Sequence, residues 1–196
     1  MKLHLLLKLW LVLLIFGCWA CRNTPANEGT AAFANPTVTN DADAQPTVIY
    51  LVRHAEKDIS DPDNQDPGLT TQGEARAEAL LAELEAEPVA ALYATKYLRT
   101  INTLKPLAAA RQLEIISYAA NDFNGLKEQI LQNNAGKTVV VAAHSNTLLP
   151  LVQAFGTKPD VTFITEQQYD YLFKVTVAPD GTSTIETGRY GAESPK

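Results

Sequence analysis

Residues 48–54 read VIYLVRH, and residues 138–144 read TVVVAAH. Each stretch is an apolar run rich in β-branched residues, which is typical of a buried strand, and each run ends in a histidine. In an open α/β sheet, ligands bind in the crevice at the carboxyl ends of the strands. His54 and His144 can therefore converge although they lie far apart in the sequence. We expect them to form a candidate catalytic pair.

Around these two stretches, short β-rich runs alternate with longer helical patterns, which indicates βαβ units on a mostly parallel sheet. The predicted strands are 48–53, 89–94, 113–118 and 137–143, and the predicted helices are 70–87, 97–111, 123–132 and 146–155. Two last runs, 169–178 and 182–187, flank a Pro-Asp-Gly turn and predict an antiparallel pair. The predicted fold is a three-layer α/β/α sandwich with a mostly parallel sheet and an antiparallel C-terminal strand pair.

The start of the first predicted helix offers two capping residues. Thr70 or Thr71 can begin the helix, and Glu74 follows Thr71 by three residues, which is the spacing of a capping box. The sequence therefore predicts a fixed helix start shortly after the loop that follows His54.

The composition fits one soluble domain and argues against general nucleic-acid binding. The chain has 196 residues, of which 46% are hydrophobic and 19% charged, and its formal net charge is −6. The leader carries Lys2 and Lys8 but no acidic residue, so its removal leaves 14 basic against 22 acidic residues. A phosphate backbone needs a basic face, which this balance does not provide.

The N-terminus predicts export. Residues 1–21 combine lysines with a short apolar run, as in a secretory signal, and the run is too short for a convincing transmembrane helix. Its end resembles a bacterial lipoprotein signal with Cys18 as the lipidated residue, and Cys21 is the alternative. An ordinary cleaved signal is a further reading. We expect an exported, lipid-anchored protein of the cell envelope.

The rest of the chain divides into a tether and a domain. Residues 22–46 are rich in Asn, Thr, Ala and Pro and contain few large apolar side chains, so they cannot bury enough surface to offset the entropy of ordering. We expect a flexible linker there and a catalytic domain over residues 47–190. Both cysteines lie in the leader, which excludes a disulfide framework for the domain.

Several polar side chains follow the predicted strands. Arg53 places a fixed cation beside His54, which titrates near neutrality, and Ser145 and Asn146 follow His144 at a predicted helix start. Arg99 stands in the first turn of a helix, where a cation opposes the helix dipole unless an anion binds nearby. An ion pair between Arg99 and a surface acid is the structural alternative.

Four motifs occur in order along residues 47–178. They are Arg53-His54-Ala55-Glu56, Leu69-Thr70-Thr71-Gln72-Gly73-Glu74-Ala75-Arg76-Ala77, Thr95-x3-Arg99-x3-Thr103 and Ala143-His144-Ser145-Asn146. Together they resemble the histidine phosphatase superfamily, also called phosphoglycerate-mutase-like, and in particular its phosphohistidine-phosphatase-like branch.

The resemblance implies a phosphatase that needs no metal and no cofactor. His54 would attack phosphorus and carry a transient phosphohistidine, while Arg53, Arg99 and His144 would hold the phosphoryl group. A neutral imidazole is a good nucleophile, and arginine forks suit phosphate oxygens. The implied partner is a small phosphorylated substrate or a phosphohistidine, with Ser145, Asn146, Glu56 and Lys57 as candidate substrate-binding residues.

The sequence departs from the family pattern in ways that concern the substrate. Ala143 replaces the common glycine before the second histidine, and Ala55 replaces a glycine after the first. The acid that protonates the leaving group is not obvious: Asp122 and Glu56 are the candidates, and Asp122 also fits a helix N-cap. Without a well-placed acid, good leaving groups would be favoured over alkyl phosphates.

The sequence has three alternative functional interpretations. A catalytically weak phosphate-binding protein of the same fold is the main alternative, because the acid is unclear. A metal-dependent hydrolase is poorly supported, since the domain has only two histidines and no HxH or HExxH spacing. Mutase activity is disfavoured because the chain lacks the long insertions that the resemblance leads us to expect.

Overall fold

The structure is a computed structural model that describes residues 44–195, and the signal, the cysteines and most of the linker predicted above lie outside these residues. It contains a mixed sheet in the order β3-β2-β4-β1-β5-β6. The strands are β1 (Thr47–Arg53), β2 (Val89–Ala94), β3 (Ile115–Ser117), β4 (Thr138–Ala143), β5 (Tyr171–Val177) and β6 (Ser183–Arg189), and the helices are α1 (Thr71–Glu83), α2 (Leu98–Arg111), α3 (Phe123–Asn133) and α4 (Leu148–Ala154).

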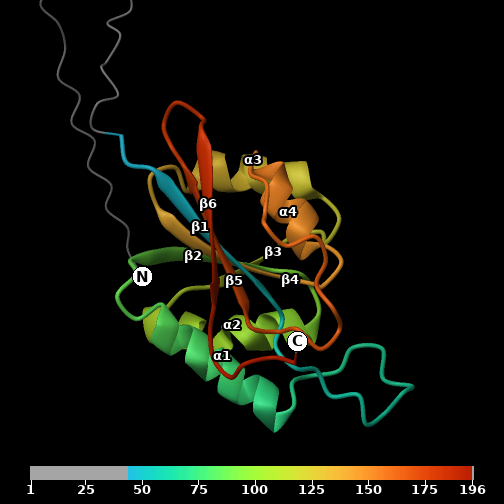
Figure 1. Ribbon diagram of the computed structural model, residues 1–196. Helices are drawn as coiled ribbons and strands as arrows, with labels where there is room; N and C mark the ends of the chain where they lie inside the picture. The colour runs from blue at the N-terminus through green and yellow to red at the C-terminus, as the bar shows by residue number, and fades with distance from the viewer. Residues whose placement is uncertain (1–43, 196) are drawn as a thin grey trace, which may run out of the picture. The chain divides into compact units, whose positions relative to one another are not determined.

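The helices cover both faces of the sheet, with α1 and α2 on one side and α3 and α4 on the other (Figure 1). The side chains of β1 explain this arrangement because they alternate between two cores. Ile49 and Leu51 pack with residues of α3 and α4, whereas Tyr50 and Val52 pack with residues of α1 and α2. A strand covered on both faces needs apolar residues at every position, which is the pattern of residues 48–52.

The strand directions confirm the predicted architecture. The pairs β1–β4, β2–β4 and β2–β3 are parallel, while β5 pairs antiparallel with β1 and with β6. Because β4 lies between β1 and β2, the carboxyl ends of these three strands meet at one edge of the sheet. The edge is where the site described below is located.

Two predicted helices are shorter in the structure. Helix α1 ends at Glu83 rather than at residue 87, because Pro88 disfavours helical backbone in the residue before it. Helix α4 begins at Leu148 rather than at residue 146, because residues 144–147 form a turn in which the His144 amide donates to Thr147 Oγ1 (3.1 Å).

The start of α1 is fixed by Thr70, whose Oγ1 accepts a hydrogen bond from the Gly73 amide (3.1 Å). The predicted capping box between Thr71 and Glu74 is therefore wrong, since Thr71 is already inside the helix. Gly73 matters for a second reason: a Cβ there would lie 2.3 Å from the Glu56 carbonyl oxygen. The helix thus packs directly against the loop that follows His54.

The chain after β6 is held to α1 and to the loop after β1. Arg76 is 2% exposed and forms a bidentate ion pair with Glu56 (2.8–3.0 Å), and it also donates to the carbonyls of Tyr190 (3.0 Å) and Ala192 (2.9 Å). Ordered contacts therefore extend past residue 190, the predicted end of the domain. Over residues 44–195 no helix has the length and apolar character needed to cross a bilayer.

Candidate active site

The two histidines meet at the carboxyl ends of β1 and β4. The His54 amide donates to the Ala143 carbonyl (2.9 Å), which continues the parallel ladder, and the two imidazole rings lie with centroids 5.4 Å apart. His54 is 3% exposed and His144 8% exposed. Ala143 is accommodated in the strand without a positive φ. The structure thus brings together the pair that the strand ends predict.

His54 is held in one tautomer by its own loop. Its Nδ1 lies 2.8 Å from the Ala55 carbonyl oxygen, which can only accept, so Nδ1 carries the proton and Nε2 keeps its lone pair. Burial, together with the charges of Arg53, His144 and Arg99, lowers the pKa of His54 to about 3. The ring is therefore neutral near pH 7 and available as a nucleophile.

His144 is oriented by a chain of hydroxyl groups. Thr100 Oγ1 donates to backbone carbonyls, so Thr95 Oγ1 donates to Thr100 Oγ1 (2.8 Å) and accepts from His144 Nε2 (3.0 Å). Burial and the charges of Arg99, Arg53 and Lys57 lower the pKa of His144 to about 4. An anion bound beside this ring would offset those cations and raise that pKa again.

Arg99 lies in the first turn of α2, as predicted, and has only a loose ionic partner. Its guanidinium stacks on the Tyr97 ring (Cζ to centroid 4.3 Å), and its Nη1 lies 3.8 Å from Asp66 Oδ1. The surface acid weighed above thus exists, but its distance is at the limit of an ion pair. The buried Nε of Arg99 has no hydrogen-bond partner among the described residues.

Arg53 is 1% exposed and is held by the segment that precedes β5. Its Nη1 donates to the carbonyls of Thr165 (2.7 Å) and Gln168 (3.0 Å), and its Nη2 donates to Glu166 Oε2 (2.8 Å). Its guanidinium also stacks on Tyr169 (Cζ to centroid 4.1 Å). Only Nε is left without a partner within the described part of the chain. Arg53 therefore anchors a loop; it does not line the pocket described next, although its charge acts on His54.

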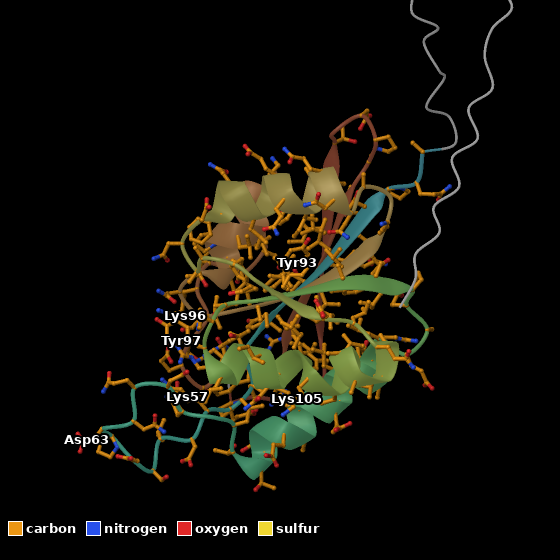
Figure 2. All side chains as sticks on the ribbon, turned by 180° about the vertical axis from the view of Figure 1, so that it is seen from behind. Lys57, Asp63, Tyr93, Lys96, Tyr97 and Lys105 are labelled. Atoms are coloured by element: carbon orange, nitrogen blue, oxygen red, sulfur yellow. The ribbon has the colours of Figure 1, made fainter. Side chains whose placement is uncertain are left out.

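A pocket of about 400 Å³ opens over the two histidines. Figure 2 shows Lys57, Lys96 and Tyr97 on the same side of the domain, whereas Asp63 lies out on the loop between β1 and α1. The predicted substrate-binding residues Lys57, Ser145 and Asn146 line the pocket. The full lining consists of His54, Lys57, Tyr97, Arg99, Ala120, Asn121, His144, Ser145, Asn146, Thr147 and Glu166.

Glu166 is the charged pocket residue that sequence reasoning missed. It comes from the loop between α4 and β5, accepts hydrogen bonds from Arg53 and from Ser145 Oγ (2.6 Å), and leaves its side chain 66% exposed. The bond from Ser145, aided by the charges of Arg53 and Lys57, holds the pKa of Glu166 below its usual value. No local pattern in a polar loop distinguishes this glutamate from its neighbours.

The two predicted acids lie elsewhere. Asp122 is the N-cap of α3, where its Oδ1 accepts from the Gly125 amide (2.9 Å), and the pocket is lined by the preceding Asn121 instead. Glu56 is paired with Arg76 and lines a neighbouring depression rather than this pocket. Glu166 is the one carboxylate among the described residues that line the histidine pocket.

A metal centre has no counterpart in the described residues, where no group of three or more His, Cys, Asp and Glu side chains could hold an ion. The cationic lining instead suits an anion. The charges of Arg53, His144 and Arg99 act on His54, and two of these groups, His144 and Arg99, line the pocket. Such a set can neutralise charge on phosphoryl oxygens.

Comparison with known proteins gives one family and one fold. The model of the histidine phosphatase superfamily (branch 1) matches residues 49–120. This match contains His54 and Arg99 but ends before His144. A search of curated proteins gives no match.

Solved structures are similar over nearly their whole length. YhfR of Bacillus stearothermophilus has 20% identity and a TM-score of 0.58, covering 71% of this chain and 95% of that one. The protein histidine phosphatase SixA, solved with tungstate, has 16% identity and a TM-score of 0.58, covering 72% and 96%. Phosphoserine phosphatase of Entamoeba histolytica, solved with 3-phosphoglyceric acid, has 12% identity and a TM-score of 0.57, covering 74% and 98%. These similarities establish a common fold.

Proposed function

We propose that the chain is a member of the histidine phosphatase superfamily, whose model matches residues 49–120, and that it is a phosphatase that transfers a phosphoryl group first to His54 and then to water. One observation carries this proposal: His54, His144 and Arg99 line the same pocket, and His54 Nε2 keeps its lone pair. The substrates are phosphomonoesters or related phosphoryl compounds small enough to reach that pocket.

In the first step, His54 Nε2 forms a bond to phosphorus while the bond to the leaving group breaks. The Nδ1 proton stays on the ring, where its bond to the Ala55 carbonyl supports the positive charge of the phosphorylated imidazole. Arg99, His144 and the Nε of Arg53 offset the charge on the equatorial oxygens. In the second step, water attacks phosphorus and neutral His54 departs.

The leaving group receives little help from the carboxylates. Glu166 is ionised at neutral pH because its pKa is lowered, and Asp122 and Glu56 are engaged elsewhere. The enzyme therefore favours substrates whose leaving group departs without a separate proton donor. Phosphoramidates, acyl phosphates and aryl phosphates are such substrates.

The test of this mechanism is His54→Asn measured on p-nitrophenyl phosphate. We expect kcat to fall by about 1,000-fold or more, as for the loss of a covalent nucleophile. The parent enzyme, quenched during turnover, should carry acid-labile, base-stable phosphate that the variant lacks. Hydrolysis that survives the substitution would refute the mechanism. Full activity in a chelator is expected, because we propose that no metal takes part.

A phosphate-binding protein without efficient turnover is the second candidate. It is favoured by one observation: both terminal nitrogens of Arg53 are already occupied by the loop of residues 165–168. Micromolar binding of inorganic phosphate together with no phosphoenzyme in the parent would support this candidate over the phosphatase.

We also propose export and lipid anchoring, with Cys18 as the modified residue and Cys21 as the alternative. The support is the sequence of residues 1–21 alone. Metabolic labelling with a radioactive fatty acid should mark the parent and not Cys18→Ser. Label that persists in Cys18→Ser and is lost in Cys21→Ser would assign the lipid to Cys21. With either cysteine, attachment of more than one acyl chain would give stable anchoring.

A further inference from the structure

Glu166 gives the pocket a fixed negative charge that the transfer of a phosphoryl group does not require. Phosphoryl transfer needs cations around phosphorus, and an ionised carboxylate beside them repels a phosphate group. The carboxylate nevertheless lies in the wall of the pocket, on a side chain that is 66% exposed. We therefore relate Glu166 to the part of the substrate that lies outside the phosphoryl group.

The carboxylate is held in position from two sides. Its Oε2 accepts from Arg53 Nη2 (2.8 Å), and its Oε1 accepts from Ser145 Oγ (2.6 Å). Arg53 comes from the end of β1 and Ser145 follows the end of β4, so the rigid edge of the sheet fixes the charge. A surface glutamate would instead sample many rotamers and carry little specificity.

The lining of the pocket carries charges of both signs. Lys57 and Arg99 line the same pocket and suit the phosphoryl oxygens. Glu166 is the acidic member of that lining among the described residues, so it offers the one ionic contact for a positively charged part of a substrate. A carboxylate accepts hydrogen bonds from ammonium and imidazolium groups with particular strength.

We propose that Glu166 selects phosphorylated compounds whose leaving group carries a positively charged nitrogen and rejects those whose leaving group carries a carboxylate. This inference rests on the proposed phosphatase function and adds the substrate class to it. Glu166 acts on the leaving group and takes no part in bond formation to His54.

Three phenyl phosphates form the matched probes. They carry, at the meta position, a 2-aminoethyl, a 2-carbamoylethyl or a 2-carboxyethyl substituent, so that the leaving phenols differ in charge but little in acidity. The ratio of kcat/KM for the amino compound to that for the carboxy compound reports selectivity. Any effect of the phosphoryl pocket itself cancels in this ratio.

The test compares the parent with Glu166→Gln, which keeps the shape and the acceptor oxygen but removes the charge. We expect the ratio to fall by about tenfold, a size consistent with one charge pair at a partly exposed site. Glu128→Gln is the matched control, because Glu128 is exposed on α3 and lines no part of the pocket. This control should leave the ratio unchanged.

Two results would overturn the proposal. One is a ratio that stays within twofold of the parent value. The other is an equal loss on all three compounds, which would make Glu166 an anchor for Arg53 and not a selectivity residue. A thermal melt of Glu166→Gln checks that the variant is folded.

The failure of the proposed function has a different signature. Hydrolysis that survives His54→Asn, or no hydrolysis of any probe, contradicts the mechanism but not the selectivity. In that case the same ratio is measured as dissociation constants by calorimetry with the three compounds. A binding ratio that is the same in the parent and in Glu166→Gln would overturn the selectivity as well.

Discussion

The strand ends and the loop between α4 and β5 build the same pocket by different means. His54 and His144 are almost completely buried and are placed by the hydrogen-bonded ladder of β1 and β4. Glu166 is largely exposed and is placed by two side-chain hydrogen bonds. The groups that hold phosphorus in the proposed mechanism are therefore built into the core, whereas the carboxylate that we propose to contact the rest of the substrate is contributed by a loop.

The largest expected effect concerns Arg99, which lies in the segment that follows the end of β2. Arg99→Gln should lower kcat/KM by about 100-fold for all three phenyl phosphates, because the loss of one charge-stabilising donor costs about that much. The selectivity ratio should stay the same, in contrast to Glu166→Gln. Steady-state kinetics on the three probes measures both quantities.

The control for this prediction is Arg111→Gln, at the other end of α2. Arg111 Nη2 donates to the carbonyls of Leu84 (3.1 Å) and Glu85 (2.5 Å), far from the pocket lining, so its loss should affect stability and not kcat/KM. If Arg99→Gln changed the selectivity ratio as much as Glu166→Gln does, selectivity would not be a separate property of the loop residue.

The buried histidines also predict a pH dependence of stability. The pKa is about 3 for His54 and about 4 for His144 in the folded protein, against an ordinary 6.5. Between pH 6.5 and these values, the unfolded chain binds more protons than the folded one. The free energy of unfolding should therefore fall with decreasing pH by about 1 kcal/mol per pH unit for each histidine.

Urea unfolding between pH 4 and pH 7 measures this slope. In His144→Gln the slope should be smaller by the contribution of one histidine. Carboxylates with lowered pKa, such as Asp170, also destabilise the folded state as pH falls, but they do so in both proteins and cancel in the difference. Identical slopes in the two proteins would show that His144 titrates normally, as a loop residue would.

Much of the strand-end part could be predicted because its causes are local. Residues 48–52 and 139–143 are apolar at every position, which is the pattern of buried strands, and a parallel sheet places their ends together. The motif containing Arg99 likewise lies directly after β2. The order of the strands and the pairing partner of each residue are set by packing over the whole domain, which no local pattern contains.

The loop part could not be predicted for the same physical reason. Glu166 reaches the pocket only because Arg53 and Ser145, from two other segments, bind its two oxygens. The sequence offers Glu56 and Asp122 as candidates for the acid that protonates the leaving group, but both have other partners in the structure. Glu56 is taken by Arg76, which lies within α1, and Asp122 is taken by the first turn of α3.

The smallest expected effect tests whether Asp122 belongs to the helix or to the pocket. Asp122→Ala removes the cap of α3 and should lower the free energy of unfolding by about 1 kcal/mol, while kcat on p-nitrophenyl phosphate stays near the parent value. Asp122→Asn keeps a side-chain oxygen that can accept from the Gly125 amide, so it should retain both stability and activity. An acid would behave in the opposite way, since the amide cannot give up a proton: kcat would fall in Asp122→Asn, and the fall would be steepest for alkyl phosphates, whose leaving groups most need protonation. Unfolding curves and kcat for the two variants thus separate a cap from a proton donor.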